Sequence, residues 1–308
     1  MMTPIVFSTD DNYVMPTAVA IKSMLTNTDL KEIEIYILYK ESLSDQSKSI
    51  LEEVIRCEGK NVNLQYLDVT PFVSRAESHI GHISGATYYR LALPELLPEY
   101  KQCLYLDGDI VVVGNIKDLL QISLPESILI GGVKALSPIF YKKKDKDIVL
   151  QELQIPDLNQ YVNAGILLIN LEEMRKSDLS SKMISMIPKG YSVQDQDIIN
   201  IVCYNRIAFL NPQFNAMPDF FEYSEKILKE VYGVDEIKTA QKSPCIIHFA
   251  DKYKPWKYSE LQNGDIWYTT YQSIFSDSLQ RKVLSRTEKL SRRIKKIKRL
   301  IYMQINGD

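Results

Sequence analysis

Short continuous apolar runs alternate with helically spaced apolar positions in the first seventy residues. The continuous runs predict buried strands at residues 5–9, 33–38 and 62–67. Apolar residues three and four apart predict helices over residues 16–27 and 43–57, with Ser44 or Asp45 as the N-cap of the second. This β-α-β-α-β order predicts parallel strands joined by right-handed crossovers. Ligands of such sheets bind beyond the carboxyl ends of the strands.

The rest of the chain continues this alternation, which predicts an α/β fold. Further buried strands are expected at residues 103–106, 110–113, 128–133, 166–169 and 245–249. Helices are expected over residues 87–97 and 171–187, and another opens at Gln194. Residues 71–85 are polar and irregular, and the lysine-rich residues 137–149 predict a loop or a short exposed helix. With no internal repeat and no Gly/Ser-rich linker, one large domain with a C-terminal appendage is expected.

The composition is that of an ordinary globular protein with a basic end. The 308 residues are 45% hydrophobic and 25% charged, and the net charge of −2 argues against nucleic-acid binding. Between Arg286 and Arg299 there are eight Lys or Arg residues and one acid, Glu288, a net charge of +7. The remainder of the chain therefore carries −9, and this asymmetry calls for an interpretation of the basic segment.

Within residues 286–308, apolar side chains recur at helical spacing. They are Leu290, Ile294, Ile297 and Ile301. Surrounded by Lys and Arg, this stripe is typical of an amphipathic helix that lies on an anionic membrane surface. The alternative is a terminal helix whose apolar stripe packs on the body of the protein while its charges are solvated. The membrane interpretation predicts a peripheral protein on the inner face of the plasma membrane.

The cysteines and the N-terminus fit a cytoplasmic protein. The four cysteines are Cys57, Cys103, Cys203 and Cys245. They are far apart and form no C-x-x-C pair, so neither a disulfide framework nor a structural zinc site is expected. The N-terminus shows no signal peptide, and no run approaches the roughly 20 apolar residues that a bilayer-spanning helix needs.

The strand at residues 103–106 ends at two carboxylates, Asp107 and Asp109, with Gly108 between them. Two like charges this close destabilise each other unless a cation or hydrogen-bond donors neutralise them. Hard divalent ions take such oxygen ligands, and a glycine permits a tight turn that aims both carboxylates at one ion. The competing interpretation is a solvated turn, since Asp and Gly dominate turns for conformational reasons.

Other polar clusters follow or precede predicted buried strands. They are Asp10 to Asn12, Asn163 to Gly165, and His248, while Gln194 to Asp197 opens a helix. Each has an ordinary structural explanation, because an Asp such as Asp195 is commonly a helix cap and a single His is commonly a hydrogen-bonded core residue. A structural role does not require all of them to meet at one edge of a parallel sheet, so together they predict a binding site.

Seven segments, taken together, resemble glycosyltransferase family 8, which includes bacterial lipooligosaccharide and lipopolysaccharide galactosyl- and glucosyltransferases and glycogenin. The segments are residues 7–13 (FSTDDNY), 89–91 (YRL), 104–110 (LYLDGDI), 163–170 (NAGILLIN), 194–197 (QDQD), 214–215 (FN) and 248–256 (HFADKYKPW). The resemblance implies a GT-A fold, a Rossmann-like mixed sheet flanked by helices, over residues 1–257, followed by a helical region over residues 258–308. It also implies a retaining hexosyltransferase that uses a UDP-hexose and Mn²⁺, with Mg²⁺ as the alternative ion.

Carried over position by position, the resemblance implies a complete site. The implied metal ligands are Asp107, Asp109 and His248. Uracil and ribose would be held by Ser8, Asp10, Asn12 and Tyr13, with Tyr13 stacked on the base. The diphosphate and the donor sugar would be faced by Arg90, Lys254, Asn163 and the backbone of Gly108, Ala164 and Gly165. Asp195 and Gln196 would hold donor hydroxyls, and Gln196 would lie nearest the reacting face.

The reaction itself leaves two mechanisms to weigh. Retention commonly uses a carboxylate nucleophile on the far face of the sugar. Here Gln196, a poor nucleophile, holds the expected place, with Asp195 and Asp197 beside it. We therefore expect front-face substitution, in which the leaving phosphate assists deprotonation of the acceptor. Tyr105 stands two residues before Asp107, where a haloacid-type phosphatase needs a nucleophilic Asp, and so argues against that class.

The sequence departs from the family pattern at two places. Asp251 stands where the family commonly has Gly, and a carboxylate there repels a diphosphate unless it turns away or pairs with Lys252. Residues 134–136 (KAL) stand where an Asp often contacts the donor sugar, which leaves the identity of the sugar open.

Two alternative functions remain open. The abundance of Tyr permits a glycogenin-like, self-glucosylating primer. A sugar-nucleotide-binding protein without turnover is the non-enzymatic alternative. The acceptor is expected to be a cell-surface glycan or glycolipid.

Overall fold

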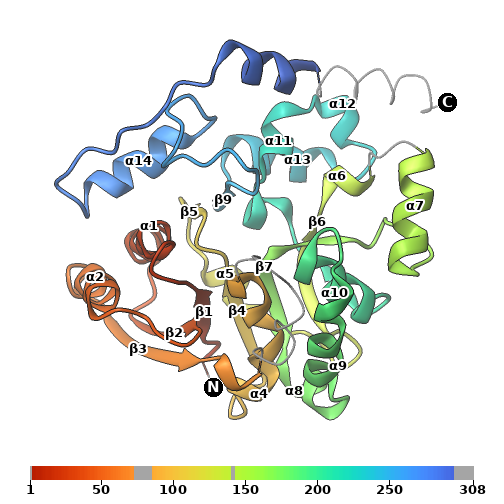
Figure 1. Cartoon of the computed structure of the whole chain (residues 1–308), viewed down its shortest axis with the longest axis horizontal. Coiled ribbons are helices and arrows are strands. Elements are labelled where there is room, and N and C mark those ends of the chain that lie inside the picture. The colour runs from red at the N-terminus through yellow and green to blue at the C-terminus, as the bar shows by residue number, and fades with distance from the viewer. Residues whose placement is uncertain (1, 73–84, 140–142, 295–308) are drawn as a thin grey trace.

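A seven-stranded mixed sheet forms the centre of the computed structural model, which describes residues 2–72, 85–139 and 143–294 (Figure 1). The spatial order of its strands is β3-β2-β1-β4-β7-β6-β8. Their bounds are β1 Ile5–Ser8, β2 Glu32–Tyr39, β3 Asn61–Asp68, β4 Gln102–Leu106, β6 Ile130–Lys134, β7 Val162–Asn170 and β8 Ile207–Phe209. Strands β1 to β4 run parallel, so the crossover order expected from the sequence is confirmed.

Strand β7 reverses direction and thereby brings a distant segment to the edge of the sheet. It pairs antiparallel with β4 on one side and with β6 on the other. The start of β7 therefore lies beside the end of β4, and the Asp107 amide donates to the carbonyl of Gly165 at 2.8 Å. The sequence predicted a strand only over residues 166–169. The observed strand includes residues 163–165, which are part of the sheet and do not precede it.

Helices cover both faces of the sheet, which explains why its central strands are continuous apolar runs. In β1, Ile5 and Phe7 face one core while Val6 faces the other. The first core is closed by α1 Val14–Asn27, α2 Asp45–Arg56, α5 Lys117–Gln121, α11 Pro218–Glu222, α12 Glu225–Leu228 and α13 Val234–Lys242. The second is closed by the 3₁₀ helix η1 Gly85–Ala92, α4 Leu93–Leu96, α8 Leu171–Lys176, α9 Leu179–Met186, η2 Ile187–Lys189 and α10 Gln194–Val202.

Two helices expected to be continuous are broken, and both breaks have local causes. The expected helix over residues 87–97 is η1 followed by α4, because Pro94 falls in the first turn of α4 and has no amide hydrogen for a longer helix. The expected helix over residues 171–187 is interrupted at Asp178, which adopts a left-handed φ of 47° that Asp tolerates better than most residues. The lysine-rich segment contains the short helices α6 Leu136–Ile139 and α7 Lys143–Leu153.

A second, two-stranded sheet pairs a segment after β4 with a segment near residue 247. Strands β5 Ile110–Val112 and β9 Ile246–His248 pair antiparallel, with Ile110 opposite His248. The sequence predicted that His248 follows a strand of the large sheet. The strand that carries it, β9, belongs instead to this two-stranded ribbon. The ribbon lies between the large sheet and the C-terminal helices in Figure 1. The 3₁₀ helix η3 Pro212–Asn215 packs against β9.

The C-terminal region packs on the rest of the chain through aromatic side chains. Helix α14 Gly264–Gln272 buries Trp267 and Tyr271 against Val19 of α1 and Val111 of β5. Residues 286–294 form a further helical stretch, and the continuation of the basic segment, with Ile297 and Ile301, lies outside the described residues. Among the helices of residues 2–72, 85–139 and 143–294, none is long and apolar enough to cross a membrane.

Candidate active site

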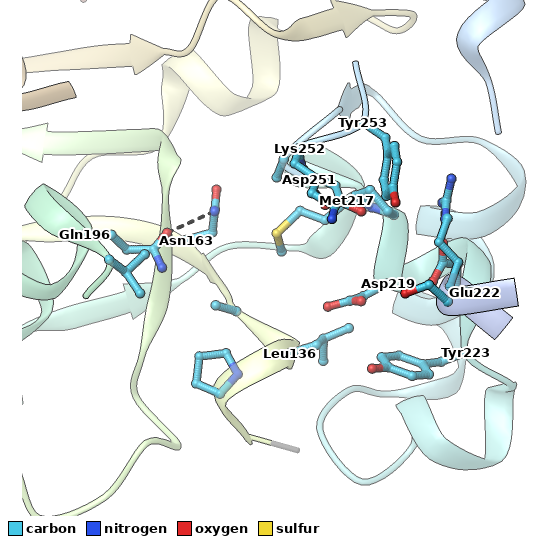
Figure 2. Close-up of a pocket in the computed structure, with 17 residues that line it drawn as sticks. Leu136, Asn163, Gln196, Met217, Asp219, Glu222, Tyr223, Asp251, Lys252 and Tyr253 are labelled. Atoms are coloured by element: carbon cyan, nitrogen blue, oxygen red, sulfur yellow. Dashed lines mark hydrogen bonds and ion pairs between the residues drawn. The ribbon is translucent and has the colours of Figure 1, made fainter. Parts of the chain in front are cut away.

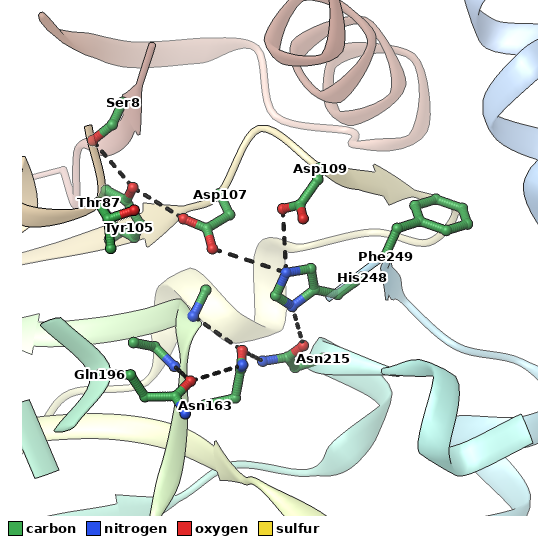
Figure 3. A network of polar contacts seen from close by, with 12 residues as sticks. Ser8, Thr87, Tyr105, Asp107, Asp109, Asn163, Gln196, Asn215, His248 and Phe249 are labelled. Atoms are coloured by element: carbon green, nitrogen blue, oxygen red, sulfur yellow. Dashed lines mark hydrogen bonds and ion pairs between the residues drawn. The ribbon is translucent and has the colours of Figure 1, made fainter. Parts of the chain in front are cut away.

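The carboxylates at the end of β4 converge on His248 (Figure 3). His248 Nε2 lies 3.2 Å from Asp109 Oδ1 and 3.9 Å from Asp107 Oδ2. One ligand atom from each of the three residues lies within 4.8 Å of the others, which makes them a candidate metal group among the described residues. Two carboxylates and one imidazole suit a hard-to-borderline divalent ion such as Mn²⁺ or Mg²⁺. The structure therefore brings together the three ligands that the sequence analysis named.

Two glycines make room for this convergence. A Cβ on Gly165 would overlap the His248 ring and lie 2.7 Å from Asp107 Oδ2. A Cβ on Gly108 would lie 2.6 Å from Thr17 Oγ1 and 3.2 Å from the Tyr13 ring. Gly108 lies in the turn between β4 and β5, as expected, but it does not have a left-handed φ, so the turn by itself does not require glycine. The glycine instead lets the carboxylate loop approach helix α1 closely.

The remaining oxygens of the two carboxylates are held by cations. Lys254 Nζ lies 2.5 Å from Asp109 Oδ2 and donates to the Phe249 carbonyl at 2.7 Å. Asp107 Oδ1 lies 2.9 Å from an Arg90 nitrogen, and the Tyr105 hydroxyl lies 3.1 Å from that oxygen. Burial works against ionisation of Asp109, but Lys254 and His248 outweigh it and lower its pKa. Burial raises the pKa of Asp107, with Arg90 opposing the shift.

Arg90 is buried between two carboxylates and also contacts an aromatic face. Its guanidinium lies 2.9 Å from both Asp107 and Asp195 oxygens, and its carbon lies 4.2 Å from the centre of the Tyr105 ring. The hydrogen on Nε, the nitrogen nearest Asp195, points to the Thr87 carbonyl, and Nη1 donates to the Ala164 carbonyl. Burial alone would lower the pKa of Arg90, but Asp107 and Asp195 raise it. The residue therefore stays charged and holds both carboxylates in place.

Asp195 has one oxygen without a hydrogen-bond donor. It is buried at the start of α10, and its Oδ2 accepts no hydrogen bond from the described part of the chain, because the Arg90 Nε hydrogen points to Thr87. Burial, assisted by the Asp107 charge and opposed by Arg90, raises the pKa of Asp195 to about 7. Val193 is the N-cap of α10, so Asp195 is not the cap. A buried oxygen of this kind suits a hydroxyl donor from a ligand.

Gln196 and Asn163 form the wall between two cavities. One cavity of about 260 Å³ is lined by Arg90, Asp107 and Asp195, and a larger one of about 400 Å³ is lined by Leu136, Asp219, Tyr253 and other side chains (Figure 2). Both cavities contact Gln196 and Asn163. Gln196 Oε1 accepts from Asn163 Nδ2 and from the Ala164 amide, each at 3.0 Å.

Asp197 faces away from these cavities. Its Oδ1 accepts from the Tyr161 hydroxyl at 2.5 Å, and its Oδ2 accepts from the Val193 amide at 2.7 Å. Both oxygens thus stabilise the first turn of α10 and its packing, and the side chain lines neither cavity. These contacts give Asp197 a structural role at the start of α10.

The residues expected to hold the nucleotide lie at the end of β1. Ser8 Oγ lies 3.1 Å from the Tyr105 hydroxyl, which also contacts Asp107. Asp10 Oδ1 accepts from the amides of Asn12 and Tyr13, so Asp10 shapes the turn into α1. The Tyr13 ring lies edge-on to Trp256 at 5.5 Å. Burial, together with the charges of Asp109 and Asp107, raises the pKa of Tyr13.

The two departures from the family pattern lie at the larger cavity. Asp251 lines that cavity, and its Oδ1 accepts from the backbone amide of Lys252. Ala135 and Leu136 also line it, while the Lys134 ammonium lies over the Phe209 ring at 4.3 Å. The side chains that replace the common Asp therefore give this wall of the cavity an apolar character.

Two residues of the site were assigned no site role from the sequence: Tyr105, whose hydroxyl contacts Asp107, and Asn215. Asn215, at the end of η3, is fully buried and bonds both Asn163 and His248. It belongs to the short segment 214–215 that resembles the family, and this was its only signal, because an Asn after an apolar residue fits many turns.

Comparisons with known proteins agree with this geometry. The family model described as Glycosyl transferase family 8 matches residues 4–260. The chain belongs to glycosyltransferase family 8. General stress protein A of Bacillus subtilis is 27% identical over 260 residues, 82% of this chain and 86% of that protein. A lipopolysaccharide 1,2-glucosyltransferase of Escherichia coli K12 is 26% identical over 265 residues, 82% of this chain and 72% of that protein.

A solved structure extends the family-8 comparison to three dimensions. The galactosyltransferase LgtC, in complex with donor and acceptor sugar analogues, superposes with a TM-score of 0.73 at 25% identity. The superposition covers 90% of this chain and 98% of LgtC. The mixed sheet flanked by helices is therefore the GT-A fold, as the sequence predicted.

Proposed function

We propose that this family-8 glycosyltransferase moves a hexose from UDP-hexose to a glycan acceptor with retention of the anomeric configuration. The observation that carries the proposal is the convergence of Asp107, Asp109 and His248 beside two adjoining cavities that share Gln196. The smaller cavity, lined by charged groups, suits the donor sugar. The larger one, with tyrosines and carboxylates, suits a second sugar. The lipopolysaccharide glucosyltransferase named above supports a cell-surface glycan as acceptor.

The residues of the site fit a divalent cation and a leaving diphosphate. When bound, the cation would neutralise the negative charge that develops on the diphosphate. Lys254 adds a positive charge beside Asp109. Arg90 holds Asp107 and Asp195 in fixed orientations, and Asp195 Oδ2 is placed to accept a sugar hydroxyl. This division of roles assigns Arg90 to positioning the carboxylates rather than to direct phosphate contact.

Front-face substitution is the mechanism these side chains support. Gln196 borders both cavities, but its amide oxygen already accepts two hydrogen bonds, and an amide is a poor nucleophile. Asp197 has both oxygens occupied. Asp195 is the carboxylate that a double displacement would have to use. A covalent sugar trapped on Asp195 and detected by mass spectrometry would contradict front-face substitution.

Metal removal tests the proposed function directly. We expect the wild-type protein to release UDP from UDP-galactose or UDP-glucose in the presence of Mn²⁺. Chelation with EDTA should abolish that release, and excess Mn²⁺ should restore it. The assay measures free UDP, and NMR of the sugar product reports the anomer. UDP release that persists unchanged after chelation would refute the metal-dependent mechanism, and absence of release from both donors would refute the hexose assignment.

We also propose that the basic C-terminal helix contacts an anionic membrane surface from the cytoplasmic side. Leu290 and Ile294 are 57% and 42% exposed, whereas Lys289 and Arg292 pair with Glu260 and Glu222 of the body. The two side chains of the stripe that lie within the described residues are therefore turned outward, which supports membrane contact over packing on the body.

Replacing Leu290 and Ile294 by Gln should weaken binding to phosphatidylglycerol vesicles, measured by co-sedimentation, by about thirtyfold or more, because the two apolar side chains together contribute roughly 2–4 kcal/mol when buried. The exposed Val234→Gln serves as the matched control, since it removes an apolar side chain from α13, which is not part of the basic segment. Vesicle binding by the double variant equal to that of the wild type would contradict the membrane proposal.

A further inference from the structure

A chain of side-chain hydrogen bonds connects the sugar cavity to the imidazole of the metal group (Figure 3). It runs from Gln196 to Asn163 at 3.0 Å, from Asn163 to Asn215 at 2.9 Å, and from Asn215 to His248 Nδ1 at 2.9 Å. Three of its four members are amides, so the direction of each bond depends on which end of each amide carries the oxygen.

Two backbone amides fix that direction. The Ala164 amide donates to Gln196 Oε1, and the Gly165 amide donates to Asn163 Oδ1. Backbone N–H groups can only donate, so both side-chain atoms are oxygens. Asn163 Oδ1 then accepts from Asn215 Nδ2, which leaves Asn215 Oδ1 facing His248. An oxygen acceptor at 2.9 Å requires His248 Nδ1 to carry the hydrogen.

We infer that Asn215 is a positioning residue that holds His248 as the Nδ1–H form and couples it to the sugar cavity. In this form the Nε2 lone pair points at Asp107 and Asp109, where a cation needs it. The inference rests on the proposed function, since it assumes a metal ion in that group. It adds that Asn215, which is neither a metal ligand nor in contact with a reacting atom, positions His248 in the metal group and Asn163 at the sugar cavity.

The backbone around Asn215 gives it little freedom. The side chain is fully buried, so water cannot replace either of its hydrogen bonds. The neighbouring Ala216 amide donates to the Ile246 carbonyl, and the His248 amide donates to the Ala216 carbonyl at 3.2 Å. Asn215 is thus held to the strand that carries His248. Loss of its amide leaves the buried His248 Nδ1 hydrogen without a partner and leaves Asn163 Oδ1 with the Gly165 amide alone.

Two substitutions separate the two bonds of Asn215. Asn215→Leu keeps the approximate shape but removes both bonds, and we expect Mn²⁺ affinity to fall by about tenfold or more. Asn215→Asp still accepts from His248 but presents an oxygen to Asn163 Oδ1. We expect its Mn²⁺ affinity to stay closer to the wild type, while kcat/KM for UDP-sugar hydrolysis falls by about tenfold, the loss expected for one buried hydrogen bond.

Electron paramagnetic resonance of free Mn²⁺ measures metal affinity without turnover, and circular dichroism verifies folding. Asn170→Leu is the matched control. It removes a buried Asn at the far end of β7, the strand that carries Asn163, where it bonds the Pro125 and Ile128 carbonyls, and should leave Mn²⁺ affinity unchanged. A folded Asn215→Leu with wild-type Mn²⁺ affinity overturns the inference but leaves the proposed function intact.

The remaining outcomes also support or overturn the inference. If Asn215→Leu does not fold, wild-type turnover by Asn215→Asp overturns the coupling to the sugar cavity, and reduced turnover with retained Mn²⁺ affinity supports it. A wild-type protein that binds no Mn²⁺ overturns both this inference and the metal-dependent function, which distinguishes that failure from the others.

Discussion

Asp109→Ala should abolish UDP release while leaving the fold intact. The substitution removes one of three candidate ligands and leaves Lys254 beside the site without its carboxylate partner. A metal contributes several kcal/mol of charge stabilisation in the transition state, so the loss should be about a thousandfold or more in kcat/KM. The measurement is the rate of UDP release with saturating Mn²⁺, together with the far-ultraviolet circular dichroism spectrum.

The structure supplies a control that differs only in location. Asp118 is an exposed acid in the first turn of α5, away from both cavities, and Asp118→Ala should retain wild-type activity. Asp109→Asn should be nearly as inactive as the Ala variant, because a neutral amide is a weak ligand for a hard cation. Near wild-type activity in either Asp109 variant would remove Asp109 from the metal group.

The large sheet could be predicted because most of its strands have a recognisable local sequence pattern. Strands β1, β2 and β4 are short apolar runs buried on both faces, and their observed ends lie within one or two residues of the predicted ends. The pairing of β5 with β9 could not be predicted this way. Ile110 and His248 are far apart in the sequence, and no local pattern records that they lie opposite each other.

The sequence predicted those site residues whose side chains are unusual at their positions, and it missed those whose side chains are ordinary there. Asp107, Asp109 and His248 are polar side chains next to buried strands, which is a visible signal. Tyr105 and Asn215 look like ordinary core and turn residues, yet they contact Asp107 and His248 respectively. Their roles come from contacts between segments, so only the folded chain reveals them.

Gly165→Ala should nearly eliminate metal binding and activity although it adds a single methyl group. The added Cβ would occupy the place of the His248 ring edge and crowd Asp107 Oδ2. The backbone cannot retreat, because the Gly165 carbonyl accepts from the Asp107 amide and the Gly165 amide donates to Asn163 Oδ1. His248 and Asp107 must therefore move apart, and we expect a loss of at least about a hundredfold in kcat/KM.

Gly131→Ala distinguishes this effect from general overpacking of the sheet. Its Cβ would meet the side-chain ends of Leu210 and Leu124 at 3.3 and 3.4 Å and the Leu168 Cβ at 3.4 Å. No contact is shorter than 3.3 Å, so the cost should be limited to about 1–3 kcal/mol of unfolding free energy with little change in turnover. Titration of Mn²⁺ against each variant and thermal unfolding provide the two measurements. A Gly165→Ala variant that binds Mn²⁺ as tightly as the wild type would show that the space between Asp107 and His248 does not hold the ion. The metal group would then have to be rebuilt without one of them.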